Sequence, residues 1–453
     1  MIQTINPATG KVEKTFEPHT AEEIEKKLQQ AADTFKMWRK TLINERTTLI
    51  QKLADHLQEE KETYAKLATL EMGRPYKESL NEIIKSIALC NFYSKNGEKF
   101  LAEENIETEA SKSYVQFDPL GVILGVMPWN YPFTQAFRPM IPAIIAGNTF
   151  VLKHASNVPQ CSQAIENMFE ICGFPKGVMT NLLVEGKNIE AIIADDRITA
   201  VTVTGSEKTG ASVASIAGKH LKKSVLELGG SDAFIVLSDA DIEHTVQQAV
   251  KARTTNAGQS CNSPKRFIVH EKIAQEFTDL FVQEVKKLTI GDPLDPKTDI
   301  GPITRSDLRD LLDKQVHDTV KKGARLLHGG KKLDREGFFY EVTVVDNVKK
   351  GMPLFDEEVF GPVAAITTVK NEEEAIGVAN DTHLGLSASV WTKNPDKVHY
   401  FTHDLHVGLV FINQAVRSDV RLPYGGVKKS GYGRELGRFG IQEFTNIKSV
   451  VIK

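Results

Sequence analysis

The sequence predicts an α/β fold with a Rossmann-like nucleotide domain and a second α/β domain. From Leu120 onward, short apolar runs alternate with helical segments, a pattern typical of βαβ units and a parallel sheet. A second series of the same kind begins after Gly230. The chain has 453 residues, more than one simple hydrophobic core needs, so two or three domains are expected.

The first hundred residues are predicted to be helical. Thr20 and Glu23 have the spacing of a capping box. The apolar residues among 24–38 recur at three- and four-residue steps, which predicts an amphipathic helix. A second helix is expected over residues 45–72, with Gly73 as the residue that ends it.

The first alternating series predicts a nucleotide-binding sheet. Residues 203–210 form a strand–turn–helix segment with Gly205 and Ser206 at the turn, and the N–H groups at such a helix start favour phosphate. The segment lacks the Gly-Lys-Ser/Thr ending of a P-loop, so nucleotide hydrolysis is not indicated. Strands are expected at residues 122–127, 149–152, 178–184 and 198–204, and helices at 157–172 and 206–217.

The second series predicts another parallel sheet, which carries Cys261, and a C-terminal strand at residues 444–451. The strands of the sheet are expected at residues 233–237, 266–269, 342–345, 363–368, 388–392 and 409–412, with helices at 241–253 and 272–288.

Composition excludes several functional classes. Lys plus Arg is 56 and Asp plus Glu is 59, a net charge of −3, so neither nucleic acid nor a strongly anionic surface is indicated as partner. The four cysteines are widely spaced, which favours a reducing compartment over a disulfide framework or a zinc site. No basic leader followed by an apolar run and no membrane-length apolar stretch is present. A cytoplasmic enzyme with no membrane association is expected.

Three short stretches carry the chemistry: residues 226–230, 258–261 and 128–132. They supply Glu227, Cys261 and Asn130, each close to glycine or proline. A thiol nucleophile, a carboxylate base and an amide donor are the groups that acyl-forming chemistry at a carbonyl requires.

Each of these residues also has a structural interpretation. Cys261 could be a packed thiol, but its neighbours are polar and Gly258 frees the backbone. Glu227 could be a salt-bridged residue at a strand end, although its two leucine neighbours favour a desolvated carboxyl with a raised pKa. Asn130 could be a turn residue before Pro132.

The three stretches together resemble the aldehyde dehydrogenase superfamily. The resemblance extends from N-P-A-T-G at residues 6–10 to L-P-Y-G-G-V-K-K-S-G at residues 422–431. It implies that Cys261 attacks an aldehyde, that Asn130 stabilises the oxyanion, and that Glu227 activates the water that hydrolyses the thioester. Water is the expected acceptor, since relatives that use coenzyme A typically lack this glutamate.

The resemblance also implies a dinucleotide cofactor, in a family that lacks the G-x-G-x-x-G fingerprint at its binding turn. Trp129 and Asn130 would border the cofactor cleft, Leu228 would offer a backbone contact, and Glu358 and Phe360 would hold the nicotinamide ribose. Lys153, in the stretch Lys153, His154, Ala155 and Ser156, would reach the adenosine ribose. At the position of Ser156, NAD enzymes often carry glutamate, so a neutral serine favours NADP over NAD, unless it only caps the next helix.

Arg138 and Ser418 are the candidate substrate residues. A guanidinium and a hydroxyl suit a carboxylate at the far end of the substrate, which resembles the short succinate-semialdehyde dehydrogenases. Arg138 could instead be a helix-surface or salt-bridged residue. A broad-range aliphatic aldehyde dehydrogenase and a non-catalytic homologue therefore remain as alternatives.

The resemblance divides the chain into three parts and implies a dimer or a tetramer. Residues 1–108 and 126–228 would bind the cofactor, and residues 229–420 would form the catalytic domain. Residues 109–125 and 436–453 would form a small β oligomerisation element. No metal is expected, although His399, His403 and His406 share a short segment.

Overall fold

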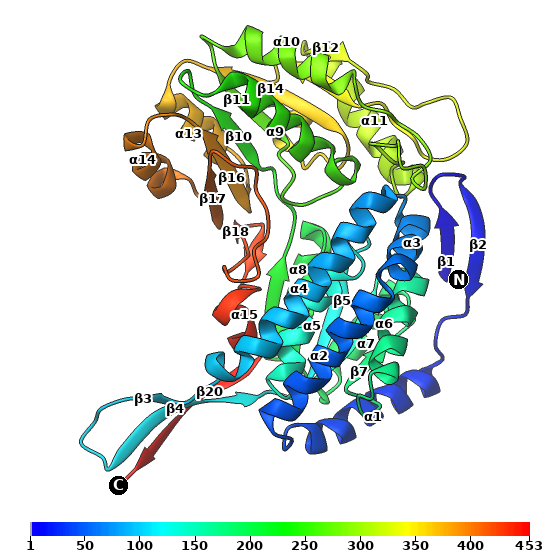
Figure 1. Cartoon of the computed structure of the whole chain (residues 1–453), viewed down its shortest axis with the longest axis vertical. Helices are drawn as coiled ribbons and strands as arrows, with labels where there is room; N and C mark the ends of the chain where they lie inside the picture. The colour runs from blue at the N-terminus through cyan, green and yellow to red at the C-terminus, as the bar shows by residue number, and fades with distance from the viewer. Residues whose placement is uncertain (1) are drawn as a thin grey trace.

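The computed structural model describes residues 2–453 and has two lobes, each built on its own sheet (Figure 1). The first lobe has a six-stranded sheet in the order β19-β9-β8-β5-β6-β7, parallel except for β19. Every residue of β5 is buried, as expected of a parallel strand covered on both faces. The strands are β5 (Val122–Met127), β6 (Thr149–His154), β7 (Met179–Asn181), β8 (Ile198–Thr204), β9 (Lys223–Glu227) and β19 (Gly431–Tyr432).

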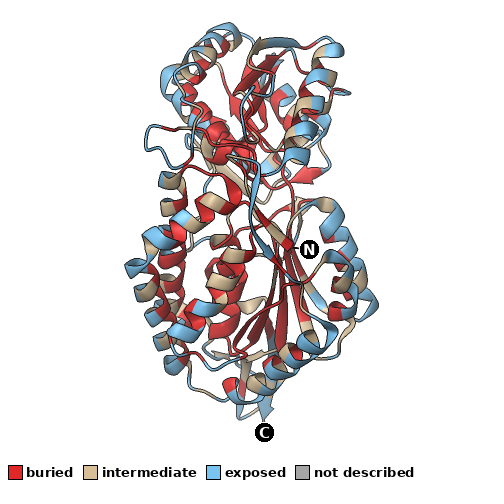
Figure 2. Cartoon of the chain, turned by 90° about the vertical axis from the view of Figure 1, so that its right-hand side faces the viewer, coloured by how far each residue is buried: buried red, intermediate tan, exposed pale blue. Residues whose placement is uncertain are grey.

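Helices surround this sheet, and their apolar faces pack inward while their outer faces are exposed (Figure 2). They are α1 (Ala21–Trp38), α2 (Ile43–Glu59), α3 (Lys61–Met72), α4 (Tyr76–Phe100), α5 (Thr134–Ile145), α6 (Pro159–Ile171), α7 (Ile189–Ala194) and α8 (Glu207–Lys219).

The second lobe has a seven-stranded sheet in the order β12-β13-β14-β11-β10-β16-β17, and only β12 runs antiparallel to its neighbour. The strands are β10 (Ala233–Val236), β11 (Arg266–His270), β12 (Arg325–His328), β13 (Thr343–Asp346), β14 (Val363–Val369), β16 (Ser387–Trp391) and β17 (Leu409–Ile412). The helices are α9 (Ile242–Thr254), α10 (Ala274–Val285), α11 (Ser306–Lys321), α12 (Pro353–Asp356), α13 (Glu372–Asn380) and α14 (Asp396–Asp404).

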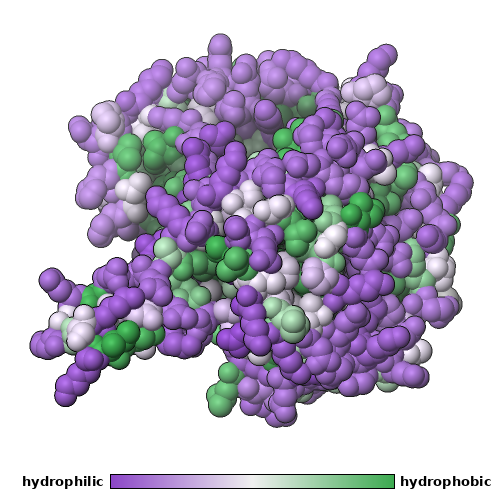
Figure 3. Space-filling view, turned by 60° about the horizontal axis from the view of Figure 1, so that its bottom comes forward, coloured by the Kyte–Doolittle hydropathy of each residue, from purple (hydrophilic) through white to green (hydrophobic). Residues whose placement is uncertain are grey.

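A three-stranded arm projects from the first lobe (Figures 1 and 3). It consists of β3 (Glu104–Asn105), β4 (Lys112–Pro119) and β20 (Thr445–Ile452), with β4 in the centre. Ile447 and Val451 on β20 are exposed by 63% and 68%, so the arm presents apolar side chains to its surroundings. The predicted oligomerisation element overlaps this arm, although residues 122–125 lie in β5 of the six-stranded sheet.

The α/β prediction with a Rossmann-like domain is confirmed, and the strands at 122–127, 198–204 and 409–412 have the predicted bounds. The capping box is also present, because Thr20 Oγ1 accepts from Glu23 N and the Glu23 side chain accepts from Thr20 N.

Three element predictions are wrong. The first hundred residues also contain a hairpin of β1 (Ile2–Asn6) and β2 (Lys11–Phe16). The predicted helix over 45–72 is two helices that meet at Glu60, whose φ of −100° and ψ of 14° break the helix. The strand predicted over 178–184 ends at Asn181, because β7 is the edge of its sheet and has one neighbour.

The remaining elements are short. They are the 3₁₀ turns η1 (Gly186–Asn188) and η2 (Thr255–Gly258), the ladder of β15 (Leu384–Gly385) with β18 (Val427–Lys428), and helix α15 (Gly437–Gln442). Within residues 2–453, no helix is both long enough and apolar enough to span a bilayer.

Candidate active site

Cys261 lies on the loop between η2 and β11, at the wall of a cleft of about 750 Å³. Its side chain is partly accessible, and its Sγ is 3.6 Å from the hydroxyl of Tyr424. The other three cysteines, Cys90, Cys161 and Cys172, are buried. Cys261 is therefore the accessible thiol of the chain.

The chain reaches Cys261 through a tight left-handed turn. Asn256, Ala257 and Gly258 have φ values of 55°, 51° and 70°. A Cβ on Gly258 would lie 2.2 Å from the carbonyl oxygen of Gly361, so only glycine fits there. Glu78 on α4 supports the turn, because its Oε2 accepts from Asn256 N at 2.7 Å.

Asn130 lies in the loop after β5 and is bonded to the same turn. Its Nδ2 donates to Gln259 O at 3.2 Å, and its own carbonyl accepts from Asn256 Nδ2 at 3.0 Å. The loop containing Asn130 and the loop containing Cys261, far apart in sequence, are thus joined by direct hydrogen bonds.

Glu227 ends strand β9 and is 3% exposed, and neither carboxylate oxygen has a hydrogen-bond partner. Burial raises the pKa of Glu227 well above its ordinary value, and the nearby Glu435 carboxylate raises it further. Arg138 and Arg434 oppose this shift. A carboxyl without partners is free to accept a proton from water, which is the property required of a general base.

Arg138 lies in α5, and it is buried in the lining of the cleft. Its Nε is 2.8 Å from Glu435 Oε2, and its guanidinium stacks 4.0 Å from the centre of the Tyr424 ring. Its Nη2 is buried and has no partner. The salt-bridged alternative is therefore present, but it leaves one donor of the guanidinium unused.

Tyr424 links these groups. Burial raises its pKa well above the ordinary value, and Cys261 and Glu227 raise it further, whereas Arg138 lowers it. Burial also raises the pKa of Cys261, and Lys265, the hydrogen bond from Tyr424 and Arg138 lower it. Cys261 and Arg138 thus both contact Tyr424, and Glu227 acts on the pKa of the same side chain.

Ser418 lines the same cleft from the loop after β17, and it is half-buried. The two residues beside Ser418 are placed differently. Arg417 is exposed at the cleft, and Asp419 pairs with Arg421 at 2.6 Å.

Trp129 and Phe360, which do not line this cleft, form an edge-to-face pair with ring centroids 5.7 Å apart. The Glu358 carboxylate lies over the glycine pair after Glu227. It accepts from Gly230 N at 3.1 Å, and a Cβ on Gly229 would lie 2.3 Å from its Oε2. A Cβ on Gly230 would instead lie 2.6 Å from the carbonyl oxygen of Cys261, so Gly229 leaves room for the Glu358 carboxylate and Gly230 leaves room for the Cys261 loop.

The stretch Lys153, His154, Ala155 and Ser156 lies at the end of β6. Lys153 is half-buried, and burial lowers its pKa. The His154 ring is used internally, because Nε2 contacts Pro132 O at 2.8 Å and Nδ1 accepts from Ala155 N at 2.9 Å. Ser156 is exposed in a turn and does not cap the next helix, because the N-cap of α6 is Val158 and it makes no side-chain cap.

The start of α8 is open to a ligand. Ser206 caps the helix, with its Oγ accepting from Thr209 N at 3.3 Å. A Cβ on Gly205 would meet nothing nearer than 3.8 Å, so space remains above the turn. Leu228 N donates to Ser430 O at 3.0 Å, and the Leu228 side chain packs on Gly210.

Tyr424, Glu435 and Lys265 are the site residues that sequence reasoning missed. Tyr424 stands inside the L-P-Y-G-G stretch, so a signal for it was present. Glu435 lies in a glycine-rich segment that has no nucleotide context, and nothing in the sequence places it beside Arg138.

The three histidines near residue 400 do not converge on one point. His399 and His403 have ring centroids 6.2 Å apart, and His403 Nδ1 is 2.9 Å from Asp404. Within residues 2–453, no group of three or more His, Cys, Asp or Glu side chains is arranged to hold a metal.

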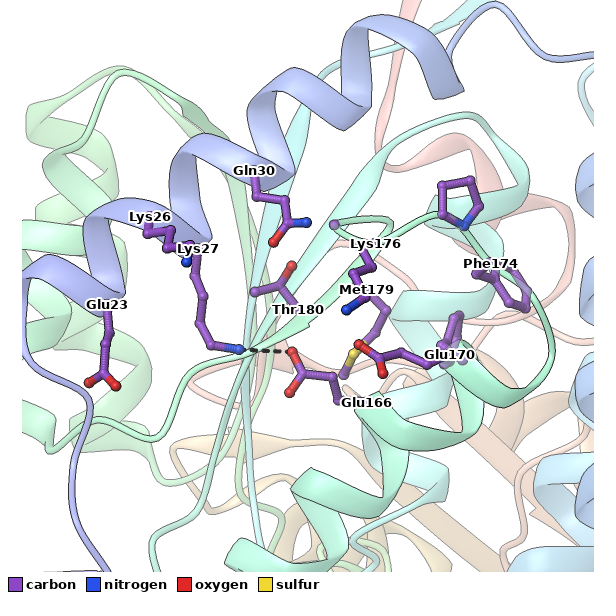
Figure 4. Close-up of a pocket in the computed structure, with 13 residues that line it drawn as sticks. Glu23, Lys26, Lys27, Gln30, Glu166, Glu170, Phe174, Lys176, Met179 and Thr180 are labelled. Atoms are coloured by element: carbon purple, nitrogen blue, oxygen red, sulfur yellow. Dashed lines mark hydrogen bonds and ion pairs between the residues drawn. The ribbon is translucent and has the colours of Figure 1, made fainter.

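A second cleft, of about 320 Å³, opens between α1 and α6 (Figure 4). Its charges are mixed, and Lys27 Nζ pairs with Glu166 Oε1 at 3.0 Å. None of the predicted site residues lines this cleft. The cleft at Cys261 is therefore the candidate active site.

Comparison with known proteins gives one consistent result. The model of the aldehyde dehydrogenase family matches residues 1–450. A probable NADP(+) succinate-semialdehyde dehydrogenase of Synechocystis sp. is 47% identical over 451 residues, which cover 100% of this chain and 99% of the relative. A succinate-semialdehyde dehydrogenase (NADP(+)) of Mycobacterium tuberculosis is 45% identical over 454 residues, with 100% and 99% coverage.

Solved structures agree with these relatives. The succinic semialdehyde dehydrogenase of Streptococcus pyogenes, in complex with NADP+, superposes with a TM-score of 0.98. The two sequences are 37% identical, and the superposition covers 100% of each chain.

Proposed function

Because the chain belongs to the aldehyde dehydrogenase family, we propose that it oxidises succinic semialdehyde to the dicarboxylic acid with NADP as the hydride acceptor. The observation that carries the substrate proposal is the unpartnered Nη2 of Arg138, buried at a cleft that Cys261 also lines. A buried donor without a partner is costly, and a substrate carboxylate would satisfy it.

The residues around the cleft divide the chemistry among them. The Cys261 thiolate forms a bond to the aldehyde carbon, and the Asn130 amide with the Cys261 N–H donates to the oxyanion. Bound NADP would supply the hydride acceptor, and loss of hydride from that carbon would leave a thioester on Cys261. Glu227 then removes a proton from water, the water oxygen bonds to the acyl carbon, and the Cys261 thiol is released with the acid.

Several features support NADP binding near Trp129, Phe360 and the start of α8. Glu358 and Phe360 would hold the nicotinamide ribose beside Trp129, where the glycine pair permits close approach. Gly205 and Ser206 would receive the diphosphate at the open start of α8, together with the backbone of Leu228. This half of the cofactor site is the better defined by geometry.

The residues that would bind the adenosine ribose of the cofactor determine the preference between NADP and NAD. Lys153, His154, Ala155 and Ser156 would form its ribose site, with His154 contributing through the loop that its ring supports. Ser156 is exposed and neutral, so the 2′-phosphate meets no carboxylate there. NAD would bind the same residues less favourably, because it has no 2′-phosphate to pair with the Lys153 ammonium.

The alternative activity is oxidation of a broad range of aliphatic aldehydes. It is favoured by the ion pair of Arg138 with Glu435, which already occupies part of the guanidinium. The two proposals differ in whether a charged aldehyde is preferred to a neutral one of similar length.

We also propose that the protein assembles as a dimer or tetramer through the arm of β3, β4 and β20, and that it is located in the cytoplasm. The exposed apolar residues of the arm support the first proposal. The four free thiols, three of them buried, suit a reducing compartment.

Kinetics with two aldehydes test the substrate proposal. Arg138→Leu is expected to lose roughly ten- to 150-fold in kcat/KM on succinic semialdehyde, the equivalent of about 1.5–3 kcal/mol for a charge-assisted bond. Butanal should be almost unaffected, since it has no carboxylate. Ser418→Ala, which removes a neutral donor, should lose less, roughly 0.5–1.5 kcal/mol.

Two controls accompany this experiment. Arg138→Lys retains a positive charge for Glu435, so it separates loss of the substrate contact from loss of the ion pair. Cys261→Ala should form no NADPH with either aldehyde. A wild-type enzyme that prefers butanal, or equal losses on both aldehydes in Arg138→Leu, would favour the broad-range activity instead.

A further inference from the structure

Lys265 is fully buried directly beneath the loop that carries Cys261. It immediately precedes β11, and its Nζ donates to the carbonyl of Ser260 at 2.8 Å and to the carbonyl of Cys261 itself. A side chain with three donors and no acceptor thus occupies the inner face of the nucleophile's own peptide groups.

Four charged or titratable groups face this ammonium. Glu358 Oε1 lies 3.8 Å away, and Asp232, Arg253 and Cys261 also act on it. Burial lowers the pKa of Lys265, while the Glu358 and Asp232 carboxylates raise it and Arg253 lowers it. Two acids near one buried lysine favour its charged form, which offsets part of the desolvation.

The neighbouring charges are already occupied by other partners. Arg253 donates to the carbonyls of Pro264 and Val359, both at 3.0 Å. The Asp232 carboxylate accepts from the hydroxyl and the N–H of Ser387. Of these groups, Lys265 is therefore the one that donates to the carbonyls of Ser260 and Cys261.

Its position gives Lys265 two effects on the thiol. By holding two consecutive carbonyls, it fixes the orientation of the peptide that contains the Cys261 N–H. Burial raises the pKa of Cys261, and the positive charge of Lys265 is the largest influence that lowers it.

We propose that Lys265 is a positioning residue for the nucleophile: it fixes the Ser260 and Cys261 carbonyls and supplies the positive charge that favours the Cys261 thiolate. The proposal rests on the proposed role of Cys261. It deepens that role by assigning the activation of the thiol to a side chain on the inner face of the loop, away from the substrate.

Alkylation of the apo enzyme by iodoacetamide tests the proposal without turnover. The rate of modification of the Cys261 peptide is measured by mass spectrometry as a function of pH, and the three buried cysteines provide an internal comparison. In Lys265→Met the midpoint of the alkylation profile should rise by roughly one pH unit or more, because a nearby positive charge has been removed. Alkylation near neutral pH should slow by about tenfold.

Two further variants at this position separate charge from hydrogen bonding. Lys265→Arg retains the charge and should keep the midpoint near that of the wild type. Lys265→Gln retains donors for the carbonyls without the charge, so its midpoint should rise as in the methionine variant. If Lys265→Met does not fold, the glutamine variant supplies the result.

Lys222 provides a matched control in the other lobe. Its Nζ also donates to two backbone carbonyls, those of Ile193 and Asp195, so Lys222→Met removes a similar interaction without touching the site. Its alkylation profile should equal that of the wild type.

Several results would overturn the proposal. One is that folded Lys265→Met or Lys265→Gln has the same alkylation midpoint as the wild type. Another is that the midpoint of Lys265→Arg rises as far as that of Lys265→Met. A third is that both neutral variants fail to fold while the arginine variant folds, which would make Lys265 purely structural. None of these outcomes depends on aldehyde oxidation, so failure here is distinguishable from failure of the proposed function.

Discussion

At the scale of single residues, the site is defined by ionisable groups that the fold leaves without partners. Glu227 has two unpartnered oxygens, and Arg138 has no partner at Nη2 and only an ion pair at Nε. Buried polar atoms are normally satisfied, so such atoms in one region mark places where a ligand or a proton is received. Stability and activity should therefore respond in opposite directions when these groups are replaced.

Glu227→Gln is expected to stabilise the protein increasingly as the pH rises. The folded-state pKa of Glu227 lies above the unfolded value, so the stability associated with its protonated form is present at low pH. It is lost as the pH rises towards the folded pKa, at up to about 1.4 kcal/mol per pH unit. Glutamine does not ionise and avoids this loss, so the difference in Tm between variant and wild type should grow from pH 5 to pH 8.

The same substitution should abolish steady turnover, because glutamine cannot accept the proton from water. Glu243→Gln, an exposed carboxylate on α9, is the control and should give a small difference in Tm that is constant with pH. A constant difference for Glu227→Gln as well would contradict the unpartnered, raised-pKa carboxyl described above.

Ser156→Glu should shift cofactor preference from NADP towards NAD. The new carboxylate would lie at the exposed turn after β6, where it would repel a 2′-phosphate and accept a hydrogen bond from a 2′-hydroxyl. The measurement is the ratio of kcat/KM for NADP and NAD, with Ser156→Gln as the uncharged control. A wild-type enzyme that already prefers NAD would contradict the proposed cofactor.

Individual residues were predictable from sequence when a local pattern surrounded them. Cys261, Glu227 and Asn130 each stand in a short stretch with glycine or proline, and the structure brings Asn130 to the Cys261 loop by hydrogen bonds. Glu435 and Lys265 were not predictable, because their importance arises from partners on other elements. No spacing rule connects residues that the tertiary structure alone brings together.

At the scale of elements, the turn between α9 and Cys261 is the most constrained segment of the site. Three consecutive residues have positive φ, and the carbonyl of Gly361 lies directly against Gly258. Such backbone is costly and persists only where surrounding contacts enforce it, here from Glu78 and Asn130.

Gly258→Ala should therefore lose both stability and activity. The added Cβ would meet Gly361 O at 2.2 Å, at a φ of 70°, so a loss of at least about 2 kcal/mol is expected. Displacement of Cys261 should lower kcat by roughly 100-fold. Stability is measured by denaturant unfolding and activity by NADPH formation.

Gly377→Ala is the matched control for this substitution. Gly377 lies inside α13 with nothing within 4 Å of an added Cβ, so alanine should stabilise the helix by about 0.5–1 kcal/mol and leave kcat unchanged. Equal effects of the two glycine substitutions would contradict the constrained turn.

Elements of the two large sheets were the most predictable part of the fold. The strands of these sheets are short, largely apolar runs bounded by turn residues. Three of them, β5, β8 and the half-buried edge strand β17, have the predicted bounds. The break between α2 and α3 was not predictable, because the helical periodicity continues across Glu60 and no proline or glycine marks it.

At the scale of the whole molecule, the arm is the feature whose apolar surface a single chain does not cover. Exposed apolar residues on β20 lie on a sheet that extends away from the core. Apolar surface of this kind typically marks an interface, and the arm is the proposed route to a dimer or tetramer.

A charge on the exposed face of β20 should reduce the oligomeric state. Ile447→Lys combined with Val451→Lys should shift the mass measured by light scattering towards that of the 50.3 kDa chain. The two residues share one face of the strand, so one face receives both charges. Asn446→Lys, on the opposite face, is the control and should leave the mass unchanged; an unchanged mass in the double variant would place the interface elsewhere.

The pairing of β19 with β9 also has a consequence for synthesis on the ribosome. Strand β9, which ends in Glu227, has an open edge until residues 431–432 are made and bind beside it, and β4 likewise waits for β20. A nascent chain that stops short of this segment therefore presents two unpaired strand edges, which favour aggregation. Truncation of the gene before the codons for β19 and β20 should yield insoluble protein, and the strand that ends in Glu227 would be fully paired only after the C-terminal residues have left the ribosome.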